Sequence, residues 1–488
     1  MTVAPTRTDH LPETTTERLS ALDRLELLCD PGSLRTIRSS VTSRRMGAKA
    51  RAGDGVVGGS GLVDGRPVYV YAQDVSFAGG SLGAAHADTI VRVLQLAREA
   101  HVPAVGFIES GGARMQEGTA ALGGYGRIFR EHVASSGLIP QISVICGTSA
   151  GGGCYAPALT DFVLMTRDAK MFLTGPAVVA EAMGENVTAE ELGGPGVHER
   201  NGVCQFVAEN DTESIFLTRE LLSYLPQNAH EAVPPRPFST HATGNPAHCV
   251  PLEARRVYDI RDVIRTIADN GRLLEVSERW AKNMVTGFAR IEGESVGVIA
   301  NQPKWLGGVI DAEASQKAAR FVRTCNSFGL PLVVLVDTPG FMPGTKQENA
   351  GVIRHGAKLL HAFAEASVPK MTVVLRKAFG GAYITMNSRD LGADYAFAWE
   401  QAEIGVMAAK QAVGIISRRE IAASDDPEGT RAALADEYGE QHLGAELAAR
   451  EGFIDEVIEP RDTRDRLAWA ITSLPKPRSR TLAGNIPL

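Results

Sequence analysis

Short apolar runs of strand length alternate with longer segments of helical spacing along most of the chain. Residues 103–109 and 141–146 are such runs in the first half, and residues 331–337 and 371–375 are such runs in the second. Near-continuous apolar strands that alternate with helices are typical of sheets that are buried on both faces. The pattern therefore predicts an α/β fold.

Polar and proline-rich segments indicate where the domains begin and end. Residues 1–17 are rich in Thr, Glu and Pro and are predicted to be disordered. Residues 19–28 have the spacing of an amphipathic helix, and an Asp-Pro-Gly stop follows them. Residues 227–246 hold four prolines and no apolar period, which is typical of an interdomain linker. We therefore expect one domain over residues 18–245 and a second over residues 246–488.

A glycine pattern occurs twice in the chain with the same spacing of 228 residues. Glycine is common here, at 51 of 488 residues, so a single match would carry little weight. Six matches in one register, each in a similar apolar context, indicate two copies of one domain that arose by internal duplication. The matched pairs are Gly65/Gly293, Gly79/Gly307, Gly80/Gly308, Gly112/Gly340, Gly152/Gly380 and Tyr155/Tyr383.

Two glycine-rich turns follow apolar strands at matching places. Residues 142–146 lead to a Gly-Gly-Gly turn at 151–153, and residues 373–377 lead to a Gly-Gly-Ala turn at 380–382. Glycines let backbone N–H groups point at a ligand, and a following helix adds partial positive charge at its N-terminus. Such a turn can hold a developing oxyanion without a charged side chain. The alternative is that these glycines only allow tight turns or close packing.

Composition narrows the class of protein. The chain is 44% hydrophobic and 22% charged, which is ordinary for a large globular enzyme. Its net charge of −7 argues against nucleic acid as the main partner. The six cysteines form no C-x-x-C pair, so we expect reduced, mostly buried thiols and no zinc ribbon. The sequence shows no signal peptide and no apolar run of membrane-spanning length, so we expect a cytoplasmic protein.

Several longer motifs occur in order along the chain. They are Ser110-Gly-Gly-Ala-Arg-Met-Gln-Glu-Gly118, Ile139-Pro-Gln-Ile142, Gly175-Pro176, Lys317-Ala-Ala-Arg-Phe-Val-Arg323, Arg354-His-Gly-Ala-Lys358 and Phe379-Gly-Gly-Ala-Tyr383. Together they closely resemble the carboxyltransferase (β) subunits of biotin-dependent acyl-CoA carboxylases, of the acetyl-/propionyl-CoA carboxylase type. The resemblance covers roughly residues 18–488, including the terminal Gly484-Asn-Ile-Pro-Leu488.

The resemblance implies two tandem crotonase-like domains in each chain and a ring-shaped hexamer with active sites between subunits. Acyl-CoA would lie on the N-terminal half and carboxybiotin on the C-terminal half. Gly151 and Gly152 would hold the thioester oxygen, with Gly111, Gly112, Ala113 and Arg114 nearby. Gly381 and Ala382 would hold the ureido oxygen of biotin, with Gly340, Phe341, Gly380 and Tyr383 on the same side. Which turn serves which oxygen stays open at this point.

The implied chemistry needs no side-chain base. Neither glycine turn is flanked by an obvious His or Glu base, and no Ser-His-Asp order is apparent. In the family that the chain resembles, the base is the biotin nitrogen, freed when carboxybiotin gives up CO₂. The protein would then supply orientation and paired oxyanion stabilisation. Glu109 and Glu117 are alternative bases by analogy with enoyl-CoA hydratases, although capping or salt bridging is commoner for such residues.

Other side chains near the motifs have both a functional and a structural interpretation. Ile384 follows the Gly-Gly-Ala-Tyr motif and is expected to line the acyl and biotin pocket, the alternative being core packing. An aliphatic residue there is similar to forms that accept acetyl-CoA, while one methylene discriminates by only about 1–3 kcal/mol, so both short acyl groups remain possible. Arg114 is expected either to contact substrate or to form a salt bridge.

The remaining candidates favour structural roles. Cys154 is expected to pack rather than act as a nucleophile, and Tyr155 and Tyr383 are expected to pack beneath their turns. A basic group precedes the first strand, and a solvated loop is favoured for it over contact with the CoA phosphates. This group comprises Arg44, Arg45, Lys49 and Arg51.

What the sequence lacks indicates its partners. Ala169-Lys170-Met171 does not match the flanks of a biotin attachment site, and no ATP-grasp loop stands out. We therefore expect a separate biotin carboxylase and biotin carrier, often joined in one α subunit, and no metal in this subunit. Two alternatives remain: the carboxyltransferase of a transcarboxylase or biotin-dependent decarboxylase, and a non-catalytic assembly scaffold. The intact glycine pairs in both halves argue against the scaffold.

Overall fold

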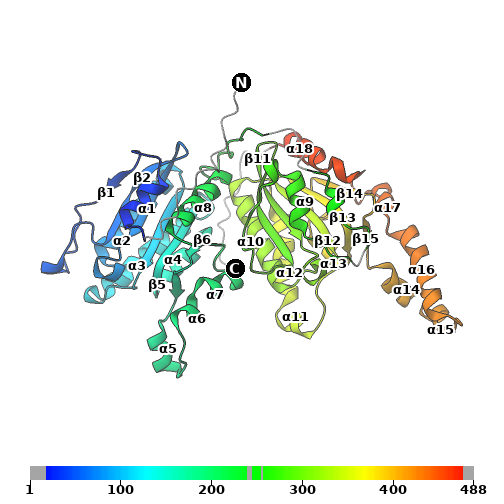
Figure 1. The fold of residues 1–488 in the computed structure, drawn as a ribbon, viewed down its shortest axis with the longest axis horizontal. Helices are drawn as coiled ribbons and strands as arrows, with labels where there is room; N and C mark the ends of the chain where they lie inside the picture. The colour runs from blue at the N-terminus through cyan, green and yellow to red at the C-terminus, as the bar shows by residue number, and fades with distance from the viewer. Residues whose placement is uncertain (1–17, 239–243, 254–255, 476–488) are drawn as a thin grey trace. The chain divides into compact units, whose positions relative to one another are not determined.

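The computed structural model describes residues 18–238, 244–253 and 256–475. The expectations for residues 1–17 and for Gly484 to Leu488 lie outside these described residues. The chain divides into two compact units between Ser223 and Tyr224 (Figure 1). This division lies earlier in the chain than the boundary expected after residue 245.

The first unit is built on an eight-stranded sheet with the order β1-β2-β3-β4-β5-β6-β8, and β7 pairs with the far end of β5. The pairs β1·β2 and β2·β3 are antiparallel, and every pair from β3 onwards is parallel. The strands are β1 (Arg35–Ile37), β2 (Val56–Val63), β3 (Arg66–Gln73), β4 (Ala104–Ser110), β5 (Gln141–Ala150), β6 (Phe162–Thr166), β7 (Lys170–Phe172) and β8 (Phe206–Ala208).

The helices of the first unit connect these strands. Ser20 caps the first of them through a capping box with Asp23, which confirms the predicted helix and sets its start at Ala21. The helices are α1 (Ala21–Leu28), α2 (Ala84–Ala100), α3 (Thr119–Ser135), α4 (Gly152–Ala158), α5 (Pro176–Met183), α6 (Ala189–Gly193), α7 (Pro195–Asn201) and α8 (Asp211–Tyr224).

The second unit repeats this architecture. Its sheet has the order β16-β14-β13-β12-β11-β10-β9, with β15 pairing with β13, and it is parallel from β11 onwards. The strands are β9 (Leu274–Glu275), β10 (Met284–Ile291), β11 (Glu294–Asn301), β12 (Leu332–Thr338), β13 (Lys370–Phe379), β14 (Tyr395–Trp399), β15 (Glu403–Gly405) and β16 (Glu456–Ile458).

Helices also alternate with strands in the second unit. Its helices are α9 (Ile260–Ile267), α10 (Ala312–Phe328), α11 (Thr345–Asn349), α12 (Val352–Glu365), α13 (Gly380–Thr385), α14 (Ala409–Ile416), α15 (Arg418–Ala423), α16 (Pro427–His442), α17 (Ala445–Arg450) and α18 (Thr463–Ser473). Among the described residues, none of the helices combines the length and the apolar character needed to cross a membrane.

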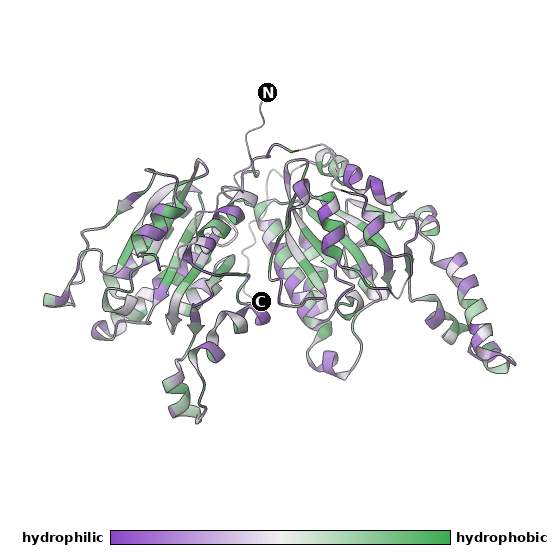
Figure 2. Cartoon of the chain, in the orientation of Figure 1, coloured by the Kyte–Doolittle hydropathy of each residue, from purple (hydrophilic) through white to green (hydrophobic). Residues whose placement is uncertain are grey.

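The parallel strands form the core of each unit. Every residue of β4 and β12 is buried, as expected for strands covered on both faces. Figure 2 shows apolar residues concentrated along the strands of both sheets. The predicted strands are therefore confirmed. β5 ends at Ala150 and β13 at Phe379, beyond the predicted ends at residues 146 and 375, so both strands lead directly into the glycine turns.

Tyr224, just before the segment interpreted as a linker, and Arg236, within that segment, pack on the second unit. The Tyr224 ring stacks on Phe288 at a centroid distance of 6.0 Å. The backbone carbonyl of Tyr224 accepts a hydrogen bond from the Ser295 hydroxyl. The Arg236 N–H donates to the Gly293 carbonyl at 3.1 Å. These contacts begin at Tyr224, which explains why the two units divide there.

The duplication is visible in the backbone, with one correction. Parallel pairing joins Ala104 to Gln141 in the first unit and Leu332 to Lys370 in the second. The first strand of each pair keeps the predicted spacing of 228, but the second strand is displaced by one further residue. Gly151 therefore corresponds to Gly380, and the predicted equivalences Gly152/Gly380 and Tyr155/Tyr383 are wrong. The second unit has one extra residue in the segment that joins β12 to β13, and the sequence pattern of that segment does not show where the residue is inserted.

Candidate functional site

Two glycine turns meet at the carboxyl end of the first sheet. Gly112, two residues after β4, has φ +95°, and Gly151, directly after β5, has φ +60°. Both values lie in the left-handed region, which favours glycine. A Cβ on Gly112 would lie 3.4 Å from the Ala150 carbonyl oxygen, so the two turns are in contact. The fold therefore brings together the two glycine motifs of the first half.

Hydrogen bonding separates the N–H groups of these turns into two kinds. The Gly111 N–H donates to the Gly79 carbonyl at 3.0 Å, and the Gly151 N–H donates to the Phe172 carbonyl at 3.1 Å. These two groups shape the turns. Gly152 is the first residue of α4, where an N–H has no acceptor within its own helix. The Gly112 N–H makes only a 3.2 Å bond, to the Ser110 hydroxyl. Gly152 and Gly112 are thus the donors best placed for a ligand oxygen.

The second unit repeats this geometry at the ends of β12 and β13. The Gly340 N–H donates to the Thr338 hydroxyl at 3.3 Å, and the Gly340 carbonyl accepts from the Ile310 N–H at 3.0 Å. Gly380 has φ +59° and begins α13, so Gly381 and Ala382 lie in the first turn, where N–H groups lack acceptors within the helix. Each unit therefore presents one glycine turn of similar backbone shape, followed by N–H groups that have no acceptor within the helix.

A buried carboxylate–cation pair lies beneath each turn. In the first unit Glu109 is 3% exposed and pairs with Arg18 and with Arg24. In the second unit the equivalent Asp337 is fully buried and pairs with Arg376 at 3.0 Å. The Tyr258 hydroxyl also donates to Asp337, at 2.9 Å.

These ion pairs decide between the two interpretations of the glutamates. Glu109 is committed to two guanidinium groups. Glu117 accepts hydrogen bonds from the Ala84 N–H and the Ser43 hydroxyl and pairs with Arg114 at 2.9 Å. Burial raises the pKa of Glu117, but these hydrogen bonds and Arg114 outweigh it and leave the pKa below its ordinary value. Both side chains therefore have the arrangement of salt bridging and capping, not of a general base.

Arg114 has the geometry of a structural ion pair. Its side chain is fully buried, with its guanidinium 2.6 Å from Asp54 and 2.9 Å from Glu117. It also donates to the Ser81 carbonyl at 2.9 Å and lies over the Phe77 ring. This is the second of the two roles expected for it: it ties the Gly112 turn to the segment before α2.

A cleft opens at the carboxyl end of the first sheet, where ligands bind in open α/β sheets. Its volume is about 660 Å³ and it reaches the Gly111 turn. The floor includes Gly147 and Thr148 of β5. The equivalent residues of the second sheet are Arg376 and Lys377. Long side chains thus occupy in the second unit the positions that border the cleft in the first.

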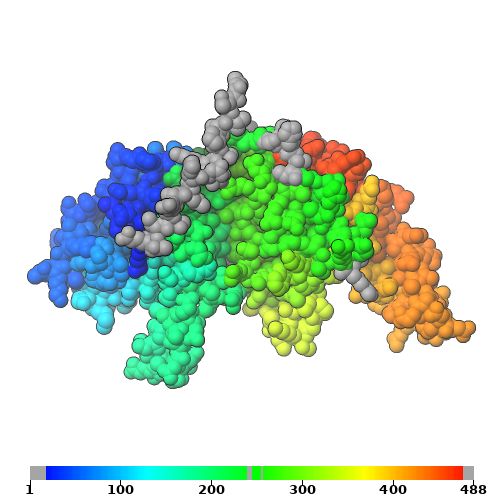
Figure 3. Space-filling view, in the orientation of Figure 1, coloured from blue at the N-terminus to red at the C-terminus, as the bar shows by residue number. Residues whose placement is uncertain are grey.

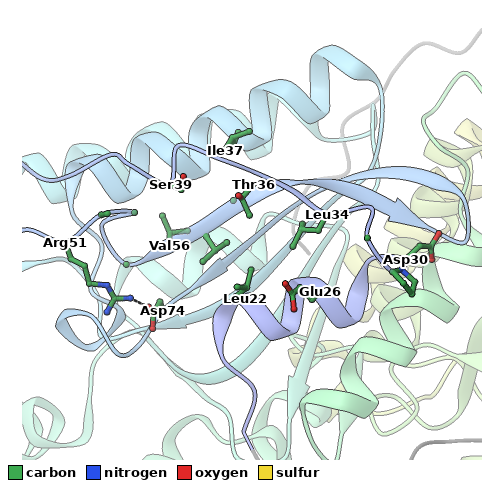
Figure 4. Close-up of a pocket in the computed structure, with 17 residues that line it drawn as sticks. Leu22, Glu26, Asp30, Leu34, Thr36, Ile37, Ser39, Arg51, Val56 and Asp74 are labelled. Atoms are coloured by element: carbon green, nitrogen blue, oxygen red, sulfur yellow. Dashed lines mark hydrogen bonds and ion pairs between the residues drawn. The ribbon is translucent and has the colours of Figure 1, made fainter.

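Two further clefts of the first unit continue from this one. One of about 450 Å³ shares Arg18 and Val75 with the first cleft, and it shares Leu22 and Arg51 with a third cleft of about 830 Å³. Figure 4 shows that third cleft beside α1, with Arg51 turned toward Asp74 at one end. Their shared lining residues place the three clefts side by side as a cleft path that leads away from the Gly111 turn.

The basic group reaches these clefts through Arg51, and it lies between β1 and β2, so the expectation that it precedes the first strand is wrong. Arg44, Arg45, Lys49 and Arg51 are all exposed. Arg51 pairs with Asp74 and donates to the Ser76 hydroxyl at 3.0 Å. Both interpretations of the group, a solvated loop and contact with phosphates, therefore remain compatible with its position.

The residues that follow each turn differ in exposure. Ile384 is 47% exposed on α13, and the equivalent Tyr155 is 53% exposed on α4. The expectation that Tyr155 packs beneath its turn is therefore wrong, because its helix position faces outward. Burial raises the pKa of Tyr383 to about 12, and its hydroxyl donates to the Phe453 carbonyl at 3.2 Å.

The cysteines have the features of packed thiols. All six are free, and five of them are buried. The Cys154 thiol lies 3.0 Å from the Ser149 carbonyl and 2.9 Å from the Phe172 carbonyl, and burial raises its pKa to about 11. Within the residues that the structure describes, no three His, Cys, Asp or Glu side chains gather as metal ligands.

Sequence reasoning missed the supports of the turns. Tyr125 of α3 packs its ring against Gly152, and Ser110 holds the Gly112 N–H. Tyr125 has no local signal, since it reads as one apolar position of a helix. Asp337 and Arg376 had a signal, because charges at the end of a buried apolar strand need a partner.

Two α/β units with matching sheets and matching glycine turns have the architecture of duplicated crotonase-like domains. Residues 12–483 match the family described as "Carboxyl transferase domain", so the chain belongs to that family of carboxyltransferases. The resemblance stated from the motifs is confirmed, as is the fold of two tandem crotonase-like domains.

Individual relatives cover nearly the whole chain. It is 46% identical over 483 residues to the propionyl-CoA carboxylase carboxyltransferase subunit of Haloferax mediterranei, covering 96% of this chain and 94% of that one. It is 45% identical to the methylmalonyl-CoA decarboxylase subunit alpha of Veillonella parvula, covering 96% and 93%. Among solved structures, a transcarboxylase 12S hexamer with bound methylmalonyl-coenzyme A matches with a TM-score of 0.92 and 45% identity, covering 96% and 92%.

Proposed function

We propose that this chain transfers a carboxyl group between biotin on a separate carrier protein and the α-carbon of a short acyl-CoA, as the carboxyltransferase subunit of an acyl-CoA carboxylase. The observation that carries the proposal is the pair of oxyanion turns, one in each unit, built from backbone N–H groups of the same geometry. Carboxyl transfer develops negative charge on two oxygens, one on the thioester and one on biotin. Two such turns match that demand.

The difference between the units supports acyl-CoA on the first and biotin on the second. The cleft path of the first unit begins at the Gly111 turn and continues past Arg51, which suits a long ligand with phosphates. In the second unit Arg376 and Lys377 stand where Gly147 and Thr148 border that cleft. A compact bicyclic group needs less room than CoA.

The N–H groups of Gly152 and Gly112 would hold the thioester oxygen as the enolate develops. This assigns to Gly112 the role expected for the whole Gly111–Gly112 turn, while Gly151 and Gly111 keep the backbone in shape. Losing one donor of this kind costs about 10²- to 10³-fold in rate.

The second turn fits a ureido oxygen. Gly381 and Ala382 offer N–H donors, and a Cβ on Gly381 would lie 3.8 Å from the Phe341 ring, so that ring forms one wall. The bound biotin supplies the activated carboxyl group and a basic nitrogen. The chain itself orients both substrates and excludes water around them.

Ile384 is the side chain that we propose lines the acyl pocket. It lies near the end of α13, two residues after Ala382, and is half-exposed within one chain. An aliphatic residue here favours acetyl-CoA as well as propionyl-CoA. The preference is small, because a methylene in such a pocket is worth about 1–3 kcal/mol.

The apolar surface around both turns supports an oligomer, for which we propose the hexamer of the related 12S structure. Helix α5 has no buried residue although its sequence is largely apolar. The space-filling view shows α5 and α14–α16 projecting from their respective units (Figure 3). A second copy would cover these exposed side chains, which include Leu173, Val178, Met183, Val406, Ile415 and Ile416. A partner with biotin carboxylase and carrier domains, and a cytoplasmic location, complete the proposal.

The reverse half-reaction tests this function without a partner. The purified chain is incubated with free biotin and either malonyl-CoA or methylmalonyl-CoA, and release of acetyl-CoA or propionyl-CoA is followed. We expect release that depends on biotin and is lost in Gly152→Leu. Release without biotin, or no release from a well-folded oligomer with either substrate, would contradict the proposal.

A transcarboxylase or decarboxylase subunit is the second candidate, because relatives of both kinds share nearly the whole chain. The half-reaction is common to all three. The partner distinguishes them. An acyl-CoA carboxylase requires a biotin carboxylase for carboxylation with bicarbonate and ATP, whereas a transcarboxylase and a decarboxylase do not require one.

A further inference from the structure

Three hydroxyl groups converge beneath the oxyanion turn of the first unit. A Cβ on Gly153 would lie 2.9 Å from Ser149 Oγ, 3.6 Å from Tyr125 Oη and 4.0 Å from Ser110 Cβ. Tyr125 is 5% exposed, and Ser110 and Ser149 are at most 1% exposed. Within the described part of the chain, Tyr125 Oη and Ser149 Oγ make no hydrogen bond of good geometry. Buried hydroxyls without partners are rare and call for an explanation.

Ser110 links this cluster to the turn. Its oxygen accepts the Gly112 N–H at 3.2 Å, which is the group assigned to the thioester oxygen. Its own proton needs an acceptor, and Tyr125 Oη is the hydroxyl beside it. Burial raises the pKa of Tyr125 to about 12, while its contact with Ser110 partly offsets that rise. The Tyr125 ring meanwhile packs on Gly152, the other donor, where a Cβ would lie 2.8 Å from the ring.

The second unit lacks this arrangement. Thr338 stands for Ser110, and its hydroxyl both accepts the Gly340 N–H and donates to the Gly340 carbonyl at 3.3 Å, within its own loop. Ala378 pairs with Thr338 where Ser149 pairs with Ser110. The ring beside Gly381 is that of Phe341, which has no hydroxyl. The hydroxyl cluster is therefore particular to the unit proposed to bind acyl-CoA.

We propose that Tyr125 is a positioning residue for carboxyl transfer, whose hydroxyl lets Ser110 release the Gly112 N–H to the substrate oxygen. When the thioester oxygen takes that N–H, the Ser110 oxygen loses its donor in a buried place. The Tyr125 hydroxyl then rotates and donates to Ser110. No proton is transferred; two hydroxyls exchange donor and acceptor roles. This inference rests on the proposed function.

Without the Tyr125 hydroxyl, Ser110 keeps the Gly112 N–H, because a buried oxygen without a donor is costly. We expect Tyr125→Phe to lower kcat of the reverse half-reaction by about three- to tenfold, the worth of one ordinary hydrogen bond, with KM for malonyl-CoA within about twofold. Tyr71→Phe is the matched control, since Tyr71 is a buried tyrosine of the same unit in the middle of β3. It should leave both constants unchanged.

A double-mutant comparison separates this role from a structural one. In a Ser110→Ala background nothing holds the Gly112 N–H, so adding Tyr125→Phe should change kcat by less than about 1.5-fold. The same loss in both backgrounds, or no loss in the single variant, would overturn the inference. Hydrogen–deuterium exchange of the peptide around Gly112 is an independent readout: Tyr125→Phe should slow it, and unchanged exchange would contradict the inference. Failure of the wild-type half-reaction itself would instead contradict the proposed function.

Discussion

The two units build the same backbone turn on different side-chain supports. Beneath the first turn, Glu109 is neutralised by Arg24 from α1 and by Arg18 just before it. Beneath the second, Asp337 is neutralised by Arg376, which comes from β13 itself. A Cβ on Gly147, the residue equivalent to Arg376, would collide with Arg18 and Glu109. The cation therefore reaches the equivalent carboxylate from a different element in each copy.

This difference shows which parts of a duplicated fold are free to change. A buried carboxylate needs a counter-charge but does not specify the element that supplies it. Where a helix supplies the arginine, the strand keeps small residues and a cleft stays open beside the turn. Where the strand supplies it, the same space is filled. The N–H groups stay constant because they belong to the backbone, so the side chains around each turn can differ while the turn keeps its shape.

Removing the buried carboxylate should lower the stability more in the second unit than in the first. We expect Asp337→Asn to cost about 3–5 kcal/mol of stability, because Arg376 is left buried without its counter-charge. Glu109→Gln should cost clearly less, because Arg24 also pairs with Asp211 at 2.9 Å and Arg18 is 55% exposed. Urea unfolding followed by circular dichroism measures both. Equal losses would show that the two supports are energetically alike.

The smallest possible substitution at each turn should also separate the units. Gly152→Ala should lower kcat by about 10²- to 10³-fold, because the new Cβ would lie 2.8 Å from the Tyr125 ring and displace the N–H. Gly381→Ala should cost much less, because its Cβ would make an ordinary contact of 3.8 Å with Phe341. Gly126→Ala is the control, since nothing lies within 4 Å of its Cβ site. A larger loss at Gly381 would contradict this comparison.

A buried lysine should give the second unit an increase of stability with pH that has no equivalent at the matching position of the first. Lys317 of α10 donates to the Trp280 and Met284 carbonyls, and burial lowers its pKa from 10.5 to about 7. Between these values the unfolded chain holds a proton that the folded chain has released. Stability should therefore rise with pH across this window, by at most about 1.4 kcal/mol per pH unit.

Unfolding midpoints measured from pH 7 to about pH 8.5 test this expectation, because at higher pH the raised pKa values of buried thiols such as Cys154 lower stability as pH rises. Lys317→Met should lose the upward slope, and the exposed Lys346→Met should keep it. In the first unit, Thr89 stands at the position of Lys317 and cannot titrate in this range. A slope that survives in Lys317→Met would assign it to another group.

The smallest effect concerns substrate choice at the two equivalent exposed positions. We expect Ile384→Ala to change the ratio of malonyl-CoA to methylmalonyl-CoA turnover by about tenfold, within the worth of one or two methylenes. Tyr155→Ala, at the matching place of the first unit, should change the ratio less, because Ile384 is the side chain proposed to line the acyl pocket. The reverse half-reaction with each substrate measures both. An unchanged ratio in Ile384→Ala would remove it from the pocket.

Much of this architecture is readable from local patterns. Apolar runs 103–109 and 331–337 became fully buried strands, because such runs are stable only inside a covered sheet. The turns stand out in the sequence as glycines. The structure gives the reason: Gly112, Gly151, Gly340 and Gly380 have positive φ values, which favour glycine over other residues. The predicted spacing of 228 residues between the two copies is correct up to Gly340. At Gly380 it is wrong by one residue, because Gly380 corresponds to Gly151. A spacing rule cannot sense an insertion that lies in a helix or loop, and only strand pairing reveals it.

The sequence by itself determined the fold class, the duplication, the family and the two glycine turns, because each depends on residues close together in the chain. Only the tertiary structure decided which N–H groups remain available, since the partners of Gly111 and Gly151 are carbonyls of Gly79 and Phe172. It also decided that Arg114 and Glu109 neutralise buried charge, and that Tyr125, Ser110 and Ser149 meet beneath one turn. Their positions along the chain carry no such information, because burial and electrostatic pairing depend on contacts between distant segments.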